Sequence, residues 1–131
     1  MKIVVKKSKK YGRGLYAARD IAKGETVESS PAIILDKWES NRIASTILNC
    51  YAFSFGEEDS AIALGFGSLF NHSEKENITY KSNLKKKTIE FKAIRDIKKD
   101  EQLFIDYGYD PKWAREETSF SKKAIQTNES R

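Results

Sequence analysis

The stretch from 65 to 73, with the sequence GFGSLFNHS, places the tightest restriction on how this chain can fold. It is apolar until it reaches Asn71, His72 and Ser73, and it contains the only histidine of the protein. Side chains of these three types compete with the backbone for hydrogen bonds, so an apolar run that ends in them predicts a buried loop. Because buried polar groups need partners, Asn71 and His72 must be bound into the core or directed at a ligand.

The rest of the chain predicts a mainly β fold made of short strands. Alternating apolar segments are separated by glycines and charged turns. One stretch differs: Asp36 and Glu39 fit a capping box, and apolar side chains recur at helical spacing, which predicts a helix over 37–48. The predicted strands cover 1–6, 26–28, 32–35, 51–55, 77–80, 88–93 and 103–105, with 77–93 forming a hairpin across a lysine-rich turn.

Length and composition indicate one globular domain. The chain has 131 residues, of which 39% are hydrophobic and 33% charged. No apolar run approaches the roughly 20 residues of a membrane helix, and the amino terminus lacks a signal-peptide pattern. Cys50 stands alone, so no disulfide is expected, and one Cys with one His cannot form a structural zinc site. We expect no metal, no membrane contact and an intracellular protein.

The formal charge is +5, and the sequence has two lysine clusters, one formed by Lys6, Lys7, Lys9 and Lys10 and the other by Lys85–Lys87. One reading is that they form solvated turns and edges that keep the protein soluble. The other is a patch for nucleic acid or an acidic protein partner, as a secondary contact. A basic protein gains no electrostatic steering towards a basic peptide.

Two segments, 18–25 and 94–101, share the order Arg-Asp-Ile, then Lys, then Glu. This similarity predicts two strand-turn units of similar shape, on opposite sides of the domain.

Gly12 to Ala17 matches G-x-G-x-x-A, the dinucleotide-binding fingerprint. That interpretation requires a helix of about ten or more residues followed by a parallel strand. The next residues are instead interrupted by Gly24 and continue into β-rich sequence, so the dinucleotide interpretation is rejected.

A second stretch, from Leu103 to Asp110, reads as a buried strand that ends in two tyrosines around a glycine. Taken with Gly12–Ala17 and the Asn71-His72 loop, in this order, it resembles the SET domain of protein lysine methyltransferases, closest to the small stand-alone viral and bacterial type. The resemblance implies a SET domain over 1–113 and a short polar post-SET tail over 114–131 without zinc-binding cysteines. It also implies a β-clip fold with one or two short helices, in which the carboxy-terminal motif is threaded as in a pseudoknot.

The function implied by the resemblance is S-adenosylmethionine-dependent methylation of a lysine on a histone or another protein. Methyl transfer to an amine needs alignment, exclusion of water and a neutral lysine, which tyrosines around a narrow channel can provide. The alternative is a SET-like module without activity that binds nucleic acid or protein through its basic clusters. A homodimer is a further expectation, with a cytoplasmic location, or a nuclear one in a eukaryotic host.

Residue roles follow from the same resemblance. Tyr107 matches the catalytic tyrosine, and the substrate channel is expected to include Tyr80, Tyr109 and Tyr51. Tyr80 matches a position that limits the number of methyl groups, and a tyrosine there favours mono- or dimethylation. The positions that match cofactor-binding residues are Gly12, Arg13, Gly14, Leu15, Asn71, His72, Tyr107 and Trp113.

Overall fold

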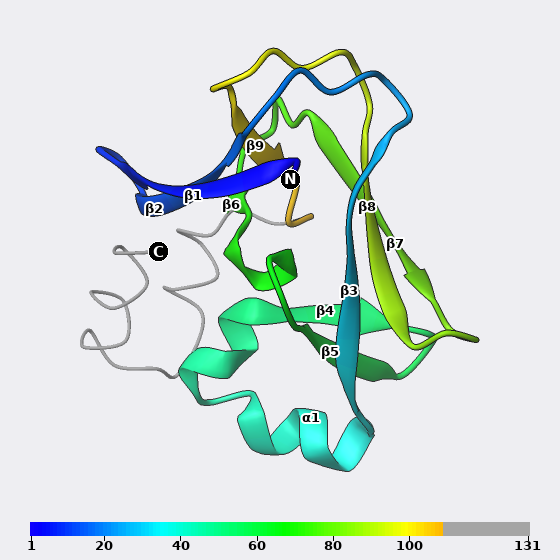
Figure 1. Cartoon of the computed structure of the whole chain (residues 1–131). Helices are drawn as coiled ribbons and strands as arrows, with labels where there is room; N and C mark the ends of the chain where they lie inside the picture. Colours follow the sequence, from blue (N-terminus) through cyan, green and yellow to red (C-terminus); the bar gives the residue numbers. More distant parts are fainter. Residues whose placement is uncertain (109–131) are drawn as a thin grey trace.

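The computed structural model describes residues 1–108, which form two sheets that share one core (Figure 1). The first sheet has four strands, in the spatial order β1 (Ile3–Ser8), β2 (Gly12–Ala17), β9 (Gln102–Ile105) and β6 (Asn71–His72). The second has five, in the order β4 (Ala52–Phe55), β5 (Asp59–Ala63), β3 (Thr26–Leu35), β8 (Thr88–Ala93) and β7 (Ile78–Asn83). The prediction of a mainly β fold is confirmed.

Strand β3 is longer than the sequence predicted. Two short strands were expected on either side of Pro31, but one ten-residue strand runs through it. The first part of β3 pairs with β8 and the second, from Ala32, pairs with β5. The missing N–H of Pro31 falls at this changeover, where one ladder ends and the other begins, so the strand tolerates the proline.

Helix α1 (Lys37–Ile43) begins where the sequence predicted, and both hydrogen bonds of the capping box between Asp36 and Glu39 are formed. The predicted end at residue 48 is wrong. The hydroxyl and the backbone N–H of Thr46 both donate to the carbonyl of Ile43, at 2.8 and 2.9 Å, and Thr46 itself is extended. A threonine that satisfies the last carbonyl in this way ends the helix. A 3-10 helix, η1 (Ile47–Tyr51), follows.

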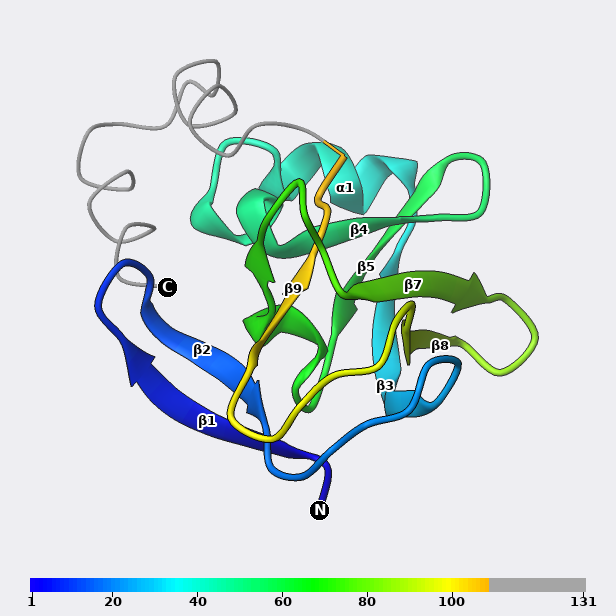
Figure 2. The same cartoon turned by 90° about the horizontal axis from the view of Figure 1, so that it is seen from above.

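Strand β9 holds the first sheet together, because it lies antiparallel to β2 on one side and parallel to β6 on the other. The 3-10 helix η2 (Gly67–Leu69) leads into β6. Beyond β6, the backbone N–H groups of Ser73 and Asn77 donate to the carbonyls of Ile105 and Phe104. The connection from β6 to β7 therefore follows β9 closely, and Figure 2 shows β9 passing beneath it. This is the arrangement expected of the threaded carboxy-terminal motif.

The two similar segments, 18–25 and 94–101, lie side by side and not on opposite sides of the domain as expected. Ile21 and Ile97 exchange both of their backbone hydrogen bonds, each at 2.8 Å. Both isoleucines are buried. The sequence similarity between the segments is thus expressed as an approximate twofold pairing at this bridge.

The aspartates of the two segments complete the pairing. Asp96 accepts a hydrogen bond from the backbone N–H of Lys23, and Asp20 accepts one from Lys99, both at 2.8 Å. The aspartate of each segment therefore binds a backbone N–H in the turn of the other segment. These hydrogen bonds join the connection before β3 to the connection before β9.

The core lies between the two sheets, and its largest fully buried apolar side chains come from both. They are Phe70, Phe91, Ile3, Leu15, Ile21, Ile78, Ile89, Ile97, Leu103 and Ile105. Three buried polar side chains, Ser30, Asn71 and Asn77, lie among the buried residues. The expected boundary between a SET domain and a polar tail, at residue 113, lies outside the described residues.

Candidate active site

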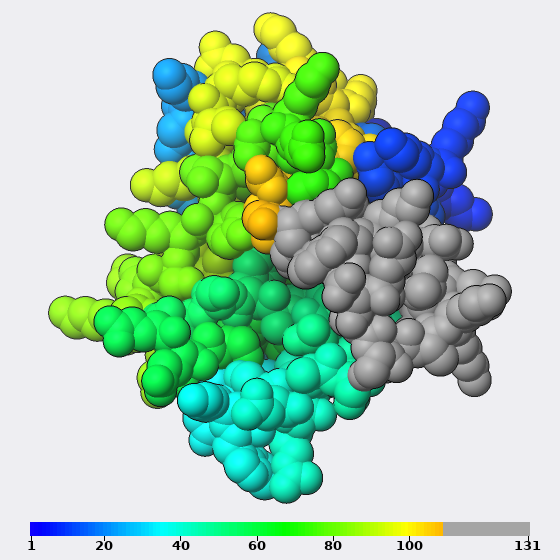
Figure 3. All heavy atoms as spheres, turned by 180° about the vertical axis from the view of Figure 1, so that it is seen from behind, coloured from blue at the N-terminus to red at the C-terminus, as the bar shows by residue number. Residues whose placement is uncertain are grey.

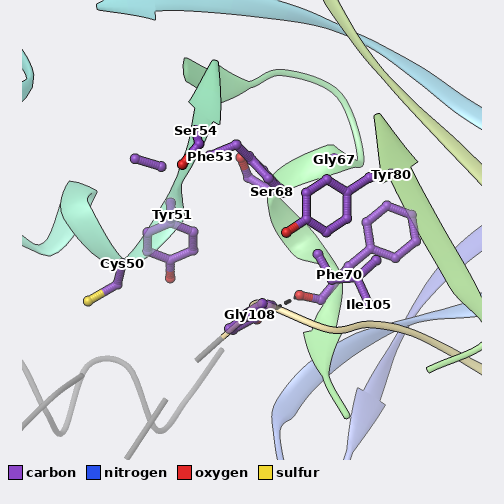
Figure 4. Close-up of a pocket in the computed structure, with 12 residues that line it drawn as sticks. Cys50, Tyr51, Phe53, Ser54, Gly67, Ser68, Phe70, Tyr80, Ile105 and Gly108 are labelled. Carbon is purple, nitrogen blue, oxygen red and sulfur yellow. Dashed lines mark hydrogen bonds between the residues drawn. The ribbon is translucent and has the colours of Figure 1, made fainter. Parts of the chain in front are cut away.

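A pocket of about 390 Å³ opens where η1, β4 and β7 approach the end of β9 (Figure 4). Three of the tyrosines singled out from the sequence, Tyr51, Tyr80 and Tyr107, line it. Figure 4 shows Tyr51 and Tyr80 on different sides of the space. The other lining residues are Cys50, Ala52, Phe53, Ser54, Gly67, Ser68, Phe70, Ile105 and Gly108.

Tyr107 directly follows β9 and is held at both its backbone and its hydroxyl. The hydroxyl donates to the backbone carbonyl of Phe70 at 2.8 Å. Phe70 is itself fixed, because its buried ring stacks on Phe91 with a centroid distance of 4.6 Å. The phenol oxygen of Tyr107 is therefore fixed at the wall of the pocket, with its proton donated to the Phe70 carbonyl.

His72 fixes the backbone of Tyr107 by a hydrogen bond and packs against its ring. Its Nδ1 accepts the backbone N–H of Tyr107 at 2.9 Å, and the two rings lie 5.0 Å apart. An Nδ1 that accepts a hydrogen bond carries no proton, so the neutral ring has its proton on Nε2. The Oδ1 of Asp106 lies 3.8 Å from Nδ1 of His72, which is too far for a hydrogen bond. This oxygen instead accepts a hydrogen bond from the backbone N–H of Gly108, at 2.8 Å. The three residues thus shape the end of β9 and do not form a proton relay.

Tyr80 enters the pocket from β7. Its ring packs edge-on against Phe53, at 5.1 Å between centroids, and lies tilted against Phe91, at 6.2 Å. Burial, and secondly the negative charge of Asp106, raises the pKa of the Tyr80 hydroxyl. The side chain is therefore a neutral phenol that can donate or accept a hydrogen bond inside the pocket.

A second cluster surrounds Asn71, in β6. The Nδ2 of Asn71 donates to the backbone carbonyl of Arg13 at 2.8 Å and to Oε1 of Gln102 at 3.0 Å. The first acceptor fixes the orientation of the amide, since a carbonyl can only accept. Its Oδ1 then has no hydrogen-bond donor among residues 1–108, although Asn71 is only 3% exposed.

An orphaned buried acceptor of this kind fits a ligand that carries an N–H donor. The ammonium group of S-adenosylmethionine is such a donor, so the residues present fit the cofactor that the sequence resemblance implied.

Gly14 makes this cluster possible. A Cβ at this position would lie 2.9 Å from Nδ2 of Asn71 and would overlap the side-chain oxygen of Gln102. A glycine is therefore required for β2 to approach Asn71. Gly12 has a φ of 81°, a conformation that also favours glycine.

Leu15, expected at the cofactor, is fully buried in the core and pairs with Leu103 of β9. A contact between Leu15 and a cofactor stays a prediction. A cofactor contact of the Arg13 backbone also stays a prediction, and the carbonyl of Arg13 already accepts a hydrogen bond from Asn71. Tyr109 and Trp113 lie outside the described residues.

Sequence analysis did not identify Asn77 as a site residue. Its side chain is 2% exposed, donates to the carbonyl of Gln102 at 2.9 Å and accepts from the N–H of Phe104 at 2.8 Å. It thereby fixes β9 between the two clusters. The only signal in the sequence was a polar residue directly before a buried strand.

No group of three His, Cys, Asp or Glu side chains in the described part of the chain could hold a metal ion. The same part contains no helix long and apolar enough to cross a membrane.

The sequence matches the family model described as the SET domain over residues 12–108. It is also 33% identical to the H3 lysine-37 specific histone-lysine N-methyltransferase of Schizosaccharomyces pombe, over 126 residues that cover 95% of this chain and 84% of the relative.

Solved structures agree with these matches. A Plasmodium falciparum protein considered to be a histone methyltransferase superimposes with a TM-score of 0.69 and 27% identity, covering 83% of this chain and 99% of that one. A chain of a humanized mutant of the Chaetomium thermophilum Polycomb Repressive Complex 2 superimposes with a TM-score of 0.68 and 30% identity, covering 81% of this chain and 15% of that one.

The named relatives come from Schizosaccharomyces, Plasmodium and Chaetomium, so the expected likeness to viral or bacterial stand-alone proteins stays a prediction. The family itself is clear, because the match includes Gly12, Gly14, the Asn71-His72 pair and Tyr107, which the fold gathers around β9. The chain belongs to the SET-domain family and is a protein-lysine N-methyltransferase, a class of enzyme that uses S-adenosylmethionine.

Proposed function

We propose that the chain methylates a lysine of a histone, with the amine held in the tyrosine-lined pocket and S-adenosylmethionine held beside Asn71. The observation that carries the proposal is the hydrogen bond from the Tyr107 hydroxyl to the Phe70 carbonyl, at 2.8 Å, inside a pocket that Tyr51 and Tyr80 also line. The named fission-yeast relative acts on H3 lysine-37, which makes histone H3 the first substrate to test.

The pocket prepares the lysine in three ways. Its aromatic walls remove water from the amine, which lowers the pKa of a lysine and favours the neutral form that can react. The faces of the tyrosine and phenylalanine rings attract the cation that enters. The oxygen of Tyr107, with its own proton donated to Phe70, accepts a hydrogen bond from the amine and sets its direction.

S-adenosylmethionine, when bound, supplies an electrophilic methyl group on its sulfonium. The chain's part is to hold that molecule in line with the amine. Asn71 offers its orphaned Oδ1 to the ammonium group of the cofactor, and Gly12 and Gly14 let the backbone of β2 come close. Trp113 is a further proposed contact, and Tyr109 a further residue of the channel.

The proposal includes a low methylation state. Tyr80 keeps a neutral hydroxyl in the pocket, and this oxygen occupies space that a third methyl group would need. We therefore expect mono- or dimethyllysine as the product. A nuclear location follows from a histone substrate, and a homodimer is retained as a proposal for the oligomeric state.

The test is methylation of a peptide that spans H3 lysine-37, with product masses read by mass spectrometry. Wild type is expected to add one or two methyl groups in a cofactor-dependent way. Tyr107→Phe removes the only group proposed to orient the amine and is expected to lower kcat by about 100-fold while the cofactor still binds. Tyr11→Phe, which makes the same chemical change outside the pocket, is the control. Full activity of Tyr107→Phe would overturn the proposed role.

A further inference from the structure

The positive charge of this protein is concentrated in the hairpin formed by β1 and β2. Seven of the 24 Lys and Arg residues lie within the first 19 residues, whereas none of the 19 Asp and Glu residues does. The remainder of the chain therefore contains more acidic than basic side chains. The net charge of +5 belongs to this hairpin, and such an asymmetry indicates a polyanionic partner.

We define the basic hairpin as Lys6, Lys7, Lys9, Lys10 and Arg13. The closeness of these positive charges destabilises the hairpin. Lys7 lies directly opposite Arg13 in the antiparallel register. Like charges in this position repel each other and destabilise the pair of strands. All five side chains belong to exposed residues, and Figure 3 shows side chains of this hairpin, in dark blue, projecting from one edge of the molecule.

Ion pairing among the described residues does not relieve this repulsion. Among residues 1–108, Lys6 alone of the five has an acidic partner, Asp100, at 3.1 Å. The turn is nevertheless held in place, because Tyr11 packs edge-on against Phe104 at 5.6 Å and Lys10 lies over the ring of Tyr11 at 5.3 Å. Within residues 1–108, the positive groups other than Lys6 are thus presented on a packed turn without an acidic partner in an ion pair.

The second lysine cluster, Lys85–Lys87, has a different setting. It follows Leu84 in the turn between β7 and β8, and the Leu84 side chain lies within 3.8 Å of a Cβ built on Gly56. Gly56 opens the turn that carries Glu57 and Glu58, and Asp59 follows as the first residue of β5. The turn that carries these lysines therefore approaches a turn with acidic residues, so the cluster serves as a comparison of equal charge in a different setting.

Protection of an exposed strand edge does not account for the whole arrangement. β1 is the edge of its sheet, and lysines on an edge discourage pairing with other chains. Lys6 and Lys7 meet that need. Lys9 and Lys10 lie in the turn, however, and Arg13 lies on β2, which is not the edge strand of the sheet.

We propose that the basic hairpin contacts the phosphate backbone of duplex DNA. This inference deepens the proposed function, since a histone substrate is wrapped in DNA. A positively charged enzyme is repelled by a free histone tail, whereas the DNA around a nucleosome attracts it. The hairpin thus directs the enzyme to assembled nucleosomes in preference to free histones.

The experiment compares wild type with two triple variants that each remove three positive charges. The first is Lys7→Gln, Lys9→Gln and Lys10→Gln, which leaves Arg13 and its contact to Asn71 in place. The control is Lys85→Gln, Lys86→Gln and Lys87→Gln. Binding to a fluorescent 20-base-pair duplex is measured from 50 to 200 mM salt, with poly-glutamate as a competing polyanion. Methylation of free H3 peptide and of nucleosomes is measured in parallel.

The hairpin variant is expected to bind the duplex at least 10-fold more weakly, and its slope of log affinity against log salt should fall by about 3. Its activity on nucleosomes should fall while its activity on free peptide does not. The control variant should stay near wild type in all of these measurements. Equal losses in both variants, or competition by poly-glutamate as strong as by unlabelled duplex, would overturn the proposal. Duplex binding without any peptide methylation would instead count against the proposed function alone.

Discussion

The side-chain nitrogen of Asn71 lies 2.8 Å from the backbone carbonyl oxygen of Arg13, although the two residues are 58 positions apart in the sequence. This contact joins β6 to β2 across the end of β9, and it fixes which face of the Asn71 amide remains for a ligand. The Nδ2 of Asn71 therefore has a structural role, and its Oδ1 has a proposed role in cofactor binding.

Asn71→Asp tests both duties, because it replaces the donor nitrogen with an oxygen of the same size. The Arg13 carbonyl and the Gln102 side chain then face a buried acceptor, which costs about 3 kcal/mol in the free energy of unfolding. We expect that loss in urea unfolding, together with loss of S-adenosylmethionine binding in calorimetry. Asn49→Asp, the same change at an exposed residue, should alter neither. Unchanged stability of Asn71→Asp would contradict the hydrogen-bond assignment.

The pairing of segments 18–25 and 94–101 gives a second prediction, at Gly24. Gly24 has a φ of 87°, and Asp100, at the equivalent place in the other segment, has a φ of 74°. Both backbone N–H groups donate at 2.8 Å to carbonyls of alanines, Ala93 and Ala17. A Cβ on Gly24 would meet nothing within 4 Å, so any cost of a substitution comes from the backbone conformation.

Gly24→Ala is therefore expected to lower the free energy of unfolding by about 1 kcal/mol, because alanine rarely adopts positive φ. Gly24→Asn should cost less, since asparagine tolerates this conformation, as Asp100 does in the other segment. Urea unfolding of both variants decides the point. Equal destabilisation by the two substitutions would mean that contacts, and not φ, govern the position.

Local patterns allowed a good part of the fold to be predicted. The capping box at Asp36 and Glu39 and the hairpin across the lysine-rich turn both depend on residues that are close in sequence, and both were found. The helix was predicted too long because apolar spacing continues past Ile43, whereas Thr46 forms the hydrogen bonds that end it. These two local hydrogen bonds outweighed the apolar periodicity.

Contacts between distant segments could not be derived from spacing. The insertion of β9 between β2 and β6 was expected only through the family resemblance. Segments 18–25 and 94–101 were expected on opposite sides of the domain, and their pairing at Ile21 and Ile97 was not predicted, because sequence similarity between two segments does not say that they touch. Asn77 was overlooked for the same reason: its partners, Gln102 and Phe104, are about 25 positions away.

Tyr80 gives a third prediction, on the number of methyl groups transferred. Tyr80→Phe keeps the ring that packs on Phe53 and Phe91 but removes the hydroxyl from the pocket. The vacated space holds about one more methyl group, so the product is expected to shift from mono- and dimethyllysine towards trimethyllysine. Mass spectrometry of H3 peptide measures the shift, and thermal unfolding should change little. Efficient trimethylation by wild type would contradict the role given to this hydroxyl.

The last prediction concerns acid stability and centres on Glu25, in the first of the two paired segments. Hydrogen bonds from Arg19, from the backbone N–H of Ala22 and from Lys2 lower the pKa of the Glu25 carboxyl from its ordinary value of 4.5 to about 2. A carboxyl whose pKa is lower in the folded state stabilises the fold fully above its unfolded pKa. That stabilisation is lost as the pH falls from about 4.5 through about 2.

Glu25→Gln removes the titrating group, so the variant should be less stable than wild type at pH 7. The difference should shrink as the pH falls below 4.5, because wild type loses its advantage there and the variant has none to lose. Urea midpoints measured at intervals from pH 7 to pH 2.5 follow this convergence. Glu57→Gln, on the exposed turn between β4 and β5, makes the same change without these hydrogen bonds and should run parallel to wild type. If the urea midpoint of Glu25→Gln also ran parallel to that of wild type over the whole pH range, the hydrogen bonds from Arg19, Ala22 and Lys2 would not stabilise the ionised carboxylate of the folded protein in solution.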